Sequence, residues 1–408
     1  MRLSSYDAAL AAIKLLEQSG FQARLAGGCV RDRLRGVAPK DHDIATDAQP
    51  EQVIALFKQA GYRTVPTGIK HGTITLVYDG IGIEITTLRA DVHTDGRHAV
   101  VEFSKDFALD AARRDFTVNA MYEDRHGKVY DYFAGQSDLQ ARKLVFVGDA
   151  DQRIQEDYLR IMRMFRFWAQ LQFTPTPAAL AATTRHSDGL ALISQERITA
   201  ELMALLREAK IALIVEQMFA VGVMAQILPA IKFKRTMLAA IVATAKVEKE
   251  YRSLARLGIL LDAVEDSEAL QALIAGLRMS NNNQAQLLVL IKMADKLAEV
   301  SSRAAAMQLI DAIERRTFIG SFLRMYYPIW SVRYGGKLRG LEFMYQTELE
   351  DGDLRRSGLP ITGDDLLAYF GKPAGVWVGK LLAKLRWEYR EKKWRTKDEG
   401  LALAKRLI

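Results

Sequence analysis

The sequence lacks the features that secreted and membrane-embedded proteins need. Its 408 residues include a single cysteine, Cys29, so no disulfide can form within the chain. No apolar run approaches the roughly 18 residues that a transmembrane helix requires. Residues 1–20 have the spacing of an amphipathic helix. They lack the apolar segment and cleavage site of a signal peptide and the Arg- and Ser-rich composition of a transit peptide. We therefore expect a cytoplasmic protein without membrane contacts.

Acidic residues are fewer than basic ones: the chain has 49 aspartates and glutamates but 57 lysines and arginines, which gives a formal net charge of +8. A positive surface suits a polyanionic partner, since basic side chains that neutralise phosphates release bound counterions. Many basic proteins bind no nucleic acid, so charge alone leaves both interpretations open. With 49% hydrophobic residues, the chain can form a large core and more than one domain. The sequence specifies no oligomeric state.

Strand patterns are confined to the first part of the chain. Short β-type runs alternate there with helical stretches such as Pro50–Gln59, whereas helical spacing dominates after about residue 149. We predict an α+β head with a mixed β-sheet and helices at residues 1–148. An all-α neck would follow at 149–215, and an all-α body and tail at 216–408. The expected strands of the head are Arg24–Ala26, His42–Ala45, Thr73–Tyr78, Ile81–Thr86, Val100–Phe103 and Thr117–Tyr122.

Two glycines mark the first candidate site. Gly27 and Gly28 follow an expected strand and precede a helix that carries Arg31. Glycines let the backbone approach phosphates, a helix N-terminus presents free N–H groups, and an arginine can bind two phosphate oxygens at once. For this stretch taken alone, a tight strand–helix turn with a surface arginine is the alternative.

A pair of aspartates follows shortly afterwards. Asp41 and Asp43 would share one face of the expected strand, because residues i and i+2 point the same way, while His42 points away. Two neighbouring carboxylates repel unless a cation lies between them, and hard oxygen ligands suit Mg²⁺. We predict a metal site at Asp41 and Asp43, with a surface pair of aspartates as the alternative. A hydrolase dyad of His42 and Asp43 is not indicated, since no other histidine has supporting spacing.

Glu84 is a third candidate carboxylate. It interrupts the β-branched run Ile81–Thr87, where a buried acid is costly without a partner or a metal. We expect Glu84 to flank the metal from a neighbouring strand. A solvent-facing glutamate on an edge strand is the alternative.

These residues and four later motifs together resemble the class II tRNA nucleotidyltransferases, or CCA-adding enzymes, of the DNA polymerase β-like superfamily. The glycine and aspartate clusters look like the catalytic motif of that family. The later motifs look like its ribose-reading, structural, base-reading and neck elements. They are Arg113–Met121, Tyr130–Gly135, Glu156–Arg163 and Ser194–Ile198.

The resemblance implies an enzyme that extends the 3′ end of tRNA with CTP and ATP and releases pyrophosphate. It implies Mg²⁺ in a two-metal site at Asp41 and Asp43, with Glu84 as a further catalytic carboxylate. Arg114 and Asp115 would bind the ribose, and Arg163 and Arg166 the triphosphate. The nucleotide-binding residues carried over from the family are Gly27, Gly28, Arg31, Arg114, Asp115, Asn119, Asp157, Arg160, Arg163 and Arg166.

The resemblance assigns the choice of base to Asp157 and Arg160. Three positions apart on one helix, they could meet at its surface. Cytosine and adenine each show an amino donor beside a ring-nitrogen acceptor, which an aspartate and an arginine complement. Uracil and guanine show the reverse order and would leave polar groups unpaired. A helix salt bridge between Glu156 and Arg160 is the plain alternative.

Three further features bear on the kind of enzyme. Residues 90–103, which include Gly96, look like the flexible loop that the family needs to change from C to A addition. The segment 84–98 most resembles alphaproteobacterial and mitochondrial members, so without a transit peptide we expect a bacterial protein. In the basic C-terminal segment, aromatic residues such as Trp387 and Trp394 would form platforms for RNA or anchor a helical core.

Other functions are compatible with the same motifs. A bacterial poly(A) polymerase has nearly the same head motifs, and tRNA nucleotidyltransferases that add only CC or only A are further variants. The alternative from another class is a catalytically silent RNA-binding protein on this scaffold. The intact aspartate pair and the Arg-Arg-Asp motif argue against it.

Overall fold

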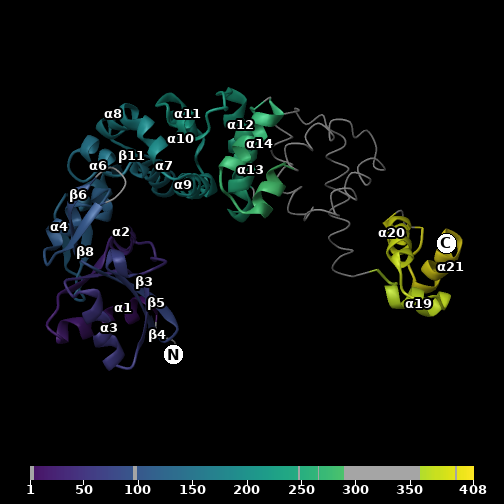
Figure 1. Ribbon diagram of the computed structural model, residues 1–408, viewed down its shortest axis with the longest axis horizontal. Coiled ribbons are helices and arrows are strands. Elements are labelled where there is room, and N and C mark those ends of the chain that lie inside the picture. Colours follow the sequence, from purple (N-terminus) through teal and green to yellow (C-terminus); the bar gives the residue numbers. More distant parts are fainter. Residues whose placement is uncertain (1–3, 95–98, 247–248, 265, 289–358, 391–392) are drawn as a thin grey trace. The chain divides into compact units, whose positions relative to one another are not determined.

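The fold comes from a computed structural model that describes residues 4–94, 99–246, 249–264, 266–288, 359–390 and 393–408 (Figure 1). Contacts divide the chain into two units: Met1–Ala245 with Ile259–Gln284, and Lys246–Gly258 with Ala285–Ile408. Residues 289–358 of the predicted body lie outside the described part, as do residues 95–98 of the predicted flexible loop. The boundaries at residues 148 and 215 stay a prediction.

A seven-stranded mixed sheet forms the head. Its strands lie in the order β3-β4-β5-β2-β1-β8-β9. The pair β2–β5 is parallel and the other neighbouring pairs are antiparallel. The predicted α+β head with a mixed sheet is therefore confirmed. The strands are β1 (Ala23–Ala26), β2 (Ile44–Thr46), β3 (Arg63–Gly68), β4 (Thr73–Tyr78), β5 (Ile81–Thr87), β8 (Met121–Glu123) and β9 (Val129–Asp131).

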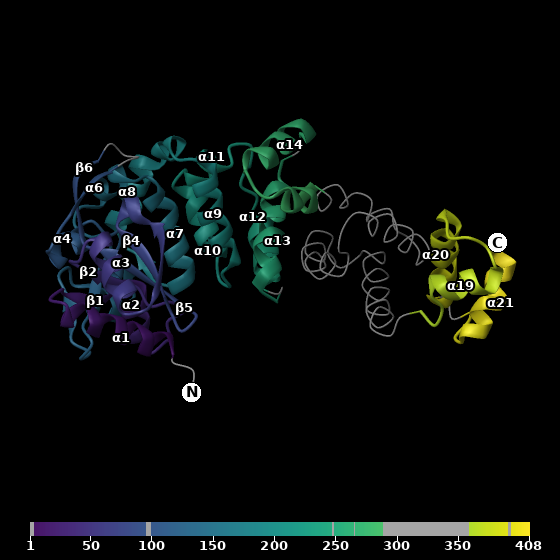
Figure 2. The same ribbon diagram turned by 60° about the horizontal axis from the view of Figure 1, so that its bottom comes forward.

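Helices cover one face of this sheet (Figure 2). α1 (Ser5–Gln18) contacts β1 and β5, and α3 (Pro50–Gln59) contacts β3 and β4. Since side chains alternate along a strand, every second residue of β4 and β5 points toward these helices, and Glu84 lies on the opposite, more exposed face. The core residues on these two strands are each at most 1% exposed: Ile74, Leu76, Ile83 and Ile85.

Two of the predicted strands are wrong in extent. β2 begins at Ile44 and not at His42, so Asp41 and Asp43 lie in the segment that leads into the strand. The expected strand Thr117–Tyr122 is a 3-10 helix at Thr117–Asn119 followed by the short β8. The N–H groups of Asn119 and Ala120 donate to carbonyls three residues back, which closes a turn instead of a ladder.

The sequence pattern also missed strands. Residues 90–103 were expected as a flexible loop, with a strand at Val100–Phe103. That strand is present as β7 (Ala99–Phe103), but its antiparallel hairpin partner β6 (Arg89–Thr94) was not predicted. The ladder satisfies backbone groups that a free loop would expose. β3 contains Pro66 and ends in Gly68, a composition that argues against a central strand but is tolerated at the edge of the sheet, where β3 lies.

Helices dominate after the head, as predicted. The neck is not entirely helical, because β10 (Lys143–Leu144) of the head pairs in parallel with β11 (Thr174–Pro175). The head also contains α2 (Gly28–Leu34), α4 (Phe107–Ala112) and α5 (Gly135–Gln140). The helices that follow are α6 (Ala150–Glu156), α7 (Leu159–Leu171), α8 (Pro177–His186), α9 (Gln195–Arg207), α10 (Ala212–Ala220), α11 (Val223–Ile227), α12 (Arg235–Ala243), α13 (Lys249–Leu261) and α14 (Ser267–Gly276).

The C-terminal segment contains α19 (Gly363–Phe370), α20 (Val376–Arg390) and α21 (Lys397–Leu407). Trp394 is 2% exposed and donates its indole N–H to the carbonyl of Leu385 at 2.9 Å. It therefore anchors the core of these helices and is not an exposed platform. In the part of the chain that the structure describes, no helix is long and apolar enough to cross a membrane.

Candidate active site

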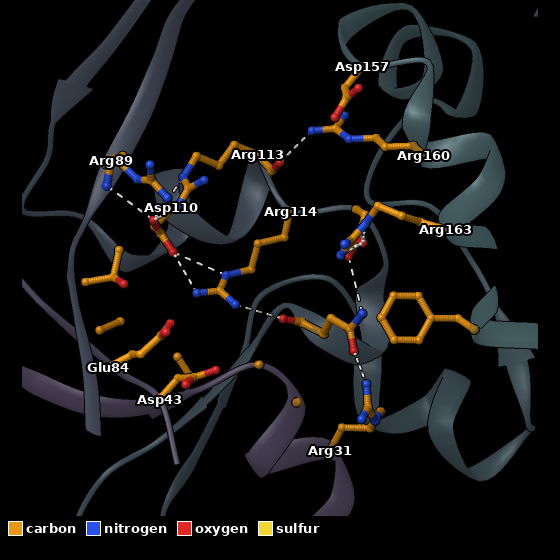
Figure 3. A pocket seen from close by; sticks show the side chains of 18 of the residues that line it. Arg31, Asp43, Glu84, Arg89, Asp110, Arg113, Arg114, Asp157, Arg160 and Arg163 are labelled. Atoms are coloured by element: carbon orange, nitrogen blue, oxygen red, sulfur yellow. Dashed lines mark hydrogen bonds and ion pairs between the residues drawn. The ribbon is translucent and has the colours of Figure 1, made fainter. Parts of the chain in front are cut away.

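A cavity of about 590 Å³ lies where strands β1, β2 and β5 meet residues of α2, α4, α7 and α9 (Figure 3). Every predicted site residue except Asp41 lines it. The surplus of arginines over carboxylates favours an anionic ligand. The arginines are Arg31, Arg89, Arg113, Arg114, Arg160, Arg163, Arg166 and Arg197, and the carboxylates are Asp43, Glu84, Asp110, Asp115 and Asp157.

Gly27 turns the chain from β1 into α2. Its φ of 72° and ψ of −119° are tolerated by glycine and strained for other residues. Its N–H donates to the carbonyl of Met121 at 3.0 Å. A Cβ at this position would lie 2.7 Å from Nη1 of Arg114, whereas one at Gly28 would make an ordinary contact with Arg31. The absent side chain of Gly27 therefore lets Arg114 lie against the turn.

Gly27→Ala is expected to lower the free energy of unfolding by about 2–5 kcal/mol, because backbone strain adds to the collision with Arg114. Gly61→Ala is a matched control, since Gly61 has a φ of +85° and nothing within 4 Å of an added Cβ. Gly61→Ala should lower the free energy of unfolding only by the contribution of backbone strain, about 1–2 kcal/mol. Urea denaturation measures both, and equal losses would contradict the close approach of Arg114.

Two carboxylates lie side by side at one end of the cavity. The parallel register pairs Ile44 with Ile85, so the residues just before them, Asp43 and Glu84, are neighbours, and Figure 3 shows both facing the cavity. Loss of hydration and the negative charges of Glu84 and Asp41 raise the pKa of Asp43 to about 6, although Arg114 opposes this rise. Glu84 thus lies on the strand beside Asp43, as predicted, but its side chain is exposed, so the predicted cost of a buried acid does not apply; β5 is also not an edge strand, as the alternative required.

His42 points away from the carboxylates. Its Nδ1 lies 3.1 Å from Oγ of Ser5, and its ring lies beside that of Tyr6, both on α1. Burial, followed by the charge of Arg33, lowers the pKa of His42, so the imidazole is held neutral. The dyad interpretation therefore finds no support, because His42 is oriented toward a helix and not toward the cavity.

The carboxylates fit a divalent cation. Neighbouring carboxylates repel one another and are stabilised by a cation between them, and oxygen donors are what Mg²⁺ prefers. No three His, Cys, Asp or Glu side chains among the described residues are grouped closely enough to hold a metal by themselves. Phosphate oxygens and water would therefore complete the coordination, as is usual for Mg²⁺. The assignment of Asp41 and Asp43 as ligands stays a prediction.

Asn119 connects the charged residues of the cavity. Its Oδ1 accepts a hydrogen bond from Nη1 of Arg31 at 2.6 Å, and its Nδ2 donates to Oδ1 of Asp115 at 3.3 Å. Its backbone carbonyl accepts from Nη1 of Arg114 at 3.2 Å. Arg31 is 4% exposed and also binds both carboxylate oxygens of Asp32. Asn119 thus fixes three predicted nucleotide-binding residues relative to one another.

The predicted ribose-binding residues are engaged within the protein. Oδ2 of Asp115 accepts from Nε and Nη2 of Arg163 at 2.8 and 2.5 Å, and Oδ1 accepts from the N–H of Phe116 at 2.8 Å. Burial would raise the pKa of Asp115, but Arg163 and these hydrogen bonds hold it below its ordinary value. A ribose hydroxyl would therefore share the oxygens of Asp115 with Arg163.

Asp110 and Glu201 were not among the residues predicted from the sequence. Asp110 is 1% exposed and forms ion pairs with Arg113 and Arg114, which follow it by three and four positions in the chain. That spacing is the signal that could have identified it. Glu201 on α9 pairs with Arg166 and lies 3.7 Å from Nη1 of Arg163.

Asp157 and Arg160 both line the cavity, but the prediction that they share one helix is wrong. Asp157 precedes α7; its Oδ1 accepts from the N–H of Leu159 at 3.1 Å, and its Oδ2 accepts from Arg197 at 3.0 Å. An aspartate before a helix satisfies free N–H groups of the first turn, which holds it outside the helix. The alternative salt bridge is also present, with 2.7 Å between Arg160 and Glu156.

Arg160 also joins the neck to the head. Its Nη2 donates to the carbonyl of Arg113 at 2.9 Å, and Nη1 of Arg153 donates to the carbonyl of Ala112 at 2.7 Å. These carbonyls end α4 and have no partner within the helix. Bonds to described residues use three of the five N–H donors of Arg160, which leaves others for a ligand.

Three arginines surround Phe167 at the other side of the cavity. The guanidinium carbons of Arg31, Arg163 and Arg166 lie 5.6, 5.5 and 4.1 Å from the centre of its ring. Cation–π attraction holds such groups in place while leaving N–H donors for an anion. This cluster is the part of the cavity best suited to a triphosphate.

Two family models match the chain. The one described as the poly A polymerase head domain covers residues 23–145, which carry the sheet and the acidic end of the cavity. A second model, described as a probable RNA- and SrmB-binding site of polymerase A, covers residues 172–234, which follow this head domain in the chain.

Known proteins similar to the chain include CCA-adding enzymes. The mitochondrial CCA tRNA nucleotidyltransferase 1 of Danio rerio is 48% identical over 204 residues, 49% of this chain and 47% of that protein. The CCA-adding enzyme of Levilactobacillus brevis is 43% identical over 203 residues, 49% of this chain and 50% of that protein. The chain thus spans about half the length of the curated relatives it matches.

A solved structure covers more of the chain. The CCA-adding enzyme of Bacillus stearothermophilus, in complex with CTP, matches 99% of this chain and 98% of its own with a TM-score of 0.72 and 28% identity. Together with the head domain and the curated relatives, it confirms the resemblance to CCA-adding enzymes that the motifs predicted.

Proposed function

We propose that this protein is a template-independent nucleotidyltransferase that adds CCA to the 3′ end of tRNA from CTP and ATP. The observation that supports this most is the convergence, in one cavity, of paired carboxylates, an arginine cluster and the pair Asp157 and Arg160. Metal-dependent phosphoryl transfer needs the first two, and a choice of base needs the third.

The reaction would be an in-line attack of the tRNA 3′ oxygen on the α-phosphorus of the nucleotide. A P–O bond forms to the RNA, the bond to the β-phosphate breaks, and pyrophosphate leaves. Bound at Asp41 and Asp43, a pair of Mg²⁺ ions would acidify the hydroxyl and neutralise the triphosphate. Arg31, Arg163 and Arg166 would donate to the triphosphate oxygens, and Arg114 and Asp115 would position the ribose.

The base would be chosen by two hydrogen bonds. Asp157 would accept from the amino group of cytosine or adenine, and Arg160 would donate to the adjacent ring nitrogen. Arg197 holds Asp157, and Glu156 holds Arg160, so both groups are oriented before the nucleotide arrives. Such orientation lowers the entropy lost on binding and increases selectivity.

The runner-up functions are a poly(A) polymerase and enzymes that add only part of CCA. The name of the matched head family fits the former, whereas the relatives named above fit CCA addition. The hairpin β6–β7 occupies the place of the loop that the resemblance links to A addition, which favours the full activity. Because tRNA matures in the cytoplasm of bacteria, we place the protein there.

Incubation with a tRNA transcript that lacks CCA is expected to distinguish these functions. With CTP alone the product should grow by two nucleotides, and with CTP and ATP by three before it stops. Denaturing gel electrophoresis resolves these lengths. A long tail made from ATP would identify a poly(A) polymerase, and the absence of any product with all four nucleotides would favour the silent RNA-binding protein.

A further inference from the structure

Asp110 has six polar contacts although it is almost fully buried. Oδ1 accepts from the N–H of Arg89 at 3.2 Å and from Nε and Nη2 of Arg113 at 3.0 and 2.7 Å. Oδ2 accepts from Nε and Nη2 of Arg114 at 3.2 and 3.1 Å and from the hydroxyl of Tyr122 at 2.6 Å. Figure 3 shows this carboxylate between the arginines, above Glu84 and Asp43 in this view.

This carboxylate is ionised at neutral pH. Burial alone would raise its pKa, but the charges of Arg114 and Arg113 and the hydroxyl of Tyr122 lower the pKa of Asp110 to about 2. Buried ion pairs are stabilising only with good geometry and satisfied hydrogen bonds, and here both oxygens are satisfied. Asp110 is thus a fixed negative charge that determines how the side chains of Arg113 and Arg114 are oriented.

The orientation of Arg114 follows from Asp110. With Nε and Nη2 bound to one oxygen, the remaining nitrogen, Nη1, points to the carbonyl of Asn119 and the turn at Gly27. The ring of Tyr122, 5.1 Å from the guanidinium carbon, limits movement on the other side. Arg114 also affects Asp43, whose raised pKa it partly offsets. Asp110 therefore determines the position of the Arg114 guanidinium relative to Asp43 and Glu84.

We infer that Asp110 is a positioning residue for nucleotide addition, which orients Arg114 toward the sugar and α-phosphate of the bound nucleoside triphosphate. The inference rests on the proposed function. Asp110 is 1% exposed, so it would act on a ligand through the arginines that it holds at the cavity wall, and Arg114 is the one that reaches the turn at Gly27. Its removal would free Arg114 to move and leave a partly buried positive charge without its partner.

Asp110→Asn is expected to lower kcat for CMP incorporation about 100-fold, the loss typical of a misplaced reacting group, with KM for tRNA unchanged. The preference for CTP over dCTP should fall as well, because Arg114 no longer meets the ribose. In a double-mutant cycle with Arg114→Gln, the double variant should be no slower than Arg114→Gln alone. Steady-state kinetics with both nucleotides supplies all three readouts.

The matched control is Glu123→Gln. Glu123 lies on β8, is 1% exposed like Asp110 and pairs with Arg33, but it does not line the cavity. It should lower the unfolding temperature as Asp110→Asn does, but leave CMP incorporation per folded molecule near that of the wild type. If Asp110→Asn fails to fold, Tyr122→Phe removes one hydrogen bond from the same carboxylate and keeps the ring over Arg114. It should reduce kcat about 3- to 10-fold, again without further effect in the Arg114→Gln background.

Additive losses in the double variants, or an unchanged preference for CTP over dCTP, would overturn the inference and reduce Asp110 to a residue of the core. This outcome differs from failure of the proposed function, in which the wild-type protein itself incorporates no nucleotide.

Discussion

Replacing Asp43 with alanine is expected to reduce nucleotide addition at least about 10³-fold, equivalent to about 4 kcal/mol of transition-state stabilisation. Asp43 is the carboxylate that both lines the cavity and neighbours Glu84. Without this carboxylate, the cation would lose a ligand, and the triphosphate would lose the cation that neutralises it. Single-turnover incorporation of radiolabelled CMP into tRNA measures the rate.

The unfolding temperature shows whether the variant loses activity because it lacks the carboxylate or because it is unfolded. Burial, followed by the charges of Glu84 and Asp41, raises the pKa of Asp43 to about 6, which means that the charged form is destabilised in the metal-free protein. Asp43→Ala should therefore unfold at the same temperature as the wild type or a higher one. Asp47→Asn, at a carboxylate that accepts from the N–H of Gln22 outside the cavity, should keep normal incorporation. Near-normal activity of Asp43→Ala with Mg²⁺ would refute the metal assignment.

The second large effect is expected on the choice of base. Asp157→Asn should decrease the preference for CTP over UTP by about 10- to 100-fold, since one bidentate base contact contributes about 1–3 kcal/mol. A carboxylate only accepts hydrogen bonds, whereas an amide can also donate to the carbonyl of uracil. The asparagine can still accept from the N–H of Leu159, so the start of α7 is preserved. Incorporation assays with each nucleotide in competition give the ratio.

Asp151→Asn serves as the comparison for this variant. Asp151 lies on α6 and pairs with Arg185 and His186, away from the residues that line the cavity. It should leave the CTP-to-UTP ratio unchanged. If the ratio is equally unchanged in Asp157→Asn, the aspartate does not read the base.

Features with a local cause were predictable from the sequence. Alternation of apolar residues predicted β4 and β5, and the two glycines predicted the turn before Arg31. Glu84 was placed beside the aspartates because a lone acid in an apolar strand calls for a partner. In each case the physical reason lies within a few consecutive residues.

Contacts across long sequence separations were not predictable. Asn119 meets Arg31 at a separation of 88 residues, and Glu201 meets Arg166 at 35. Composition alone does not indicate which of the many arginines an acid will bind. The contact between Asp157 and Arg197, 40 residues later, was missed for the same reason.

The carbonyls of Ala112 and Arg113 that accept from Arg153 and Arg160 have a consequence for engineering by recombination. Arg160, proposed to recognise the base, closes the end of the helix that carries Asp110. A chimera that joins this head to a foreign neck would keep the two carbonyls but replace the arginines that bind them. Swaps of nucleotide preference between homologous enzymes should therefore succeed when residues 107–166 are transferred as one block, and fail at crossover points inside it.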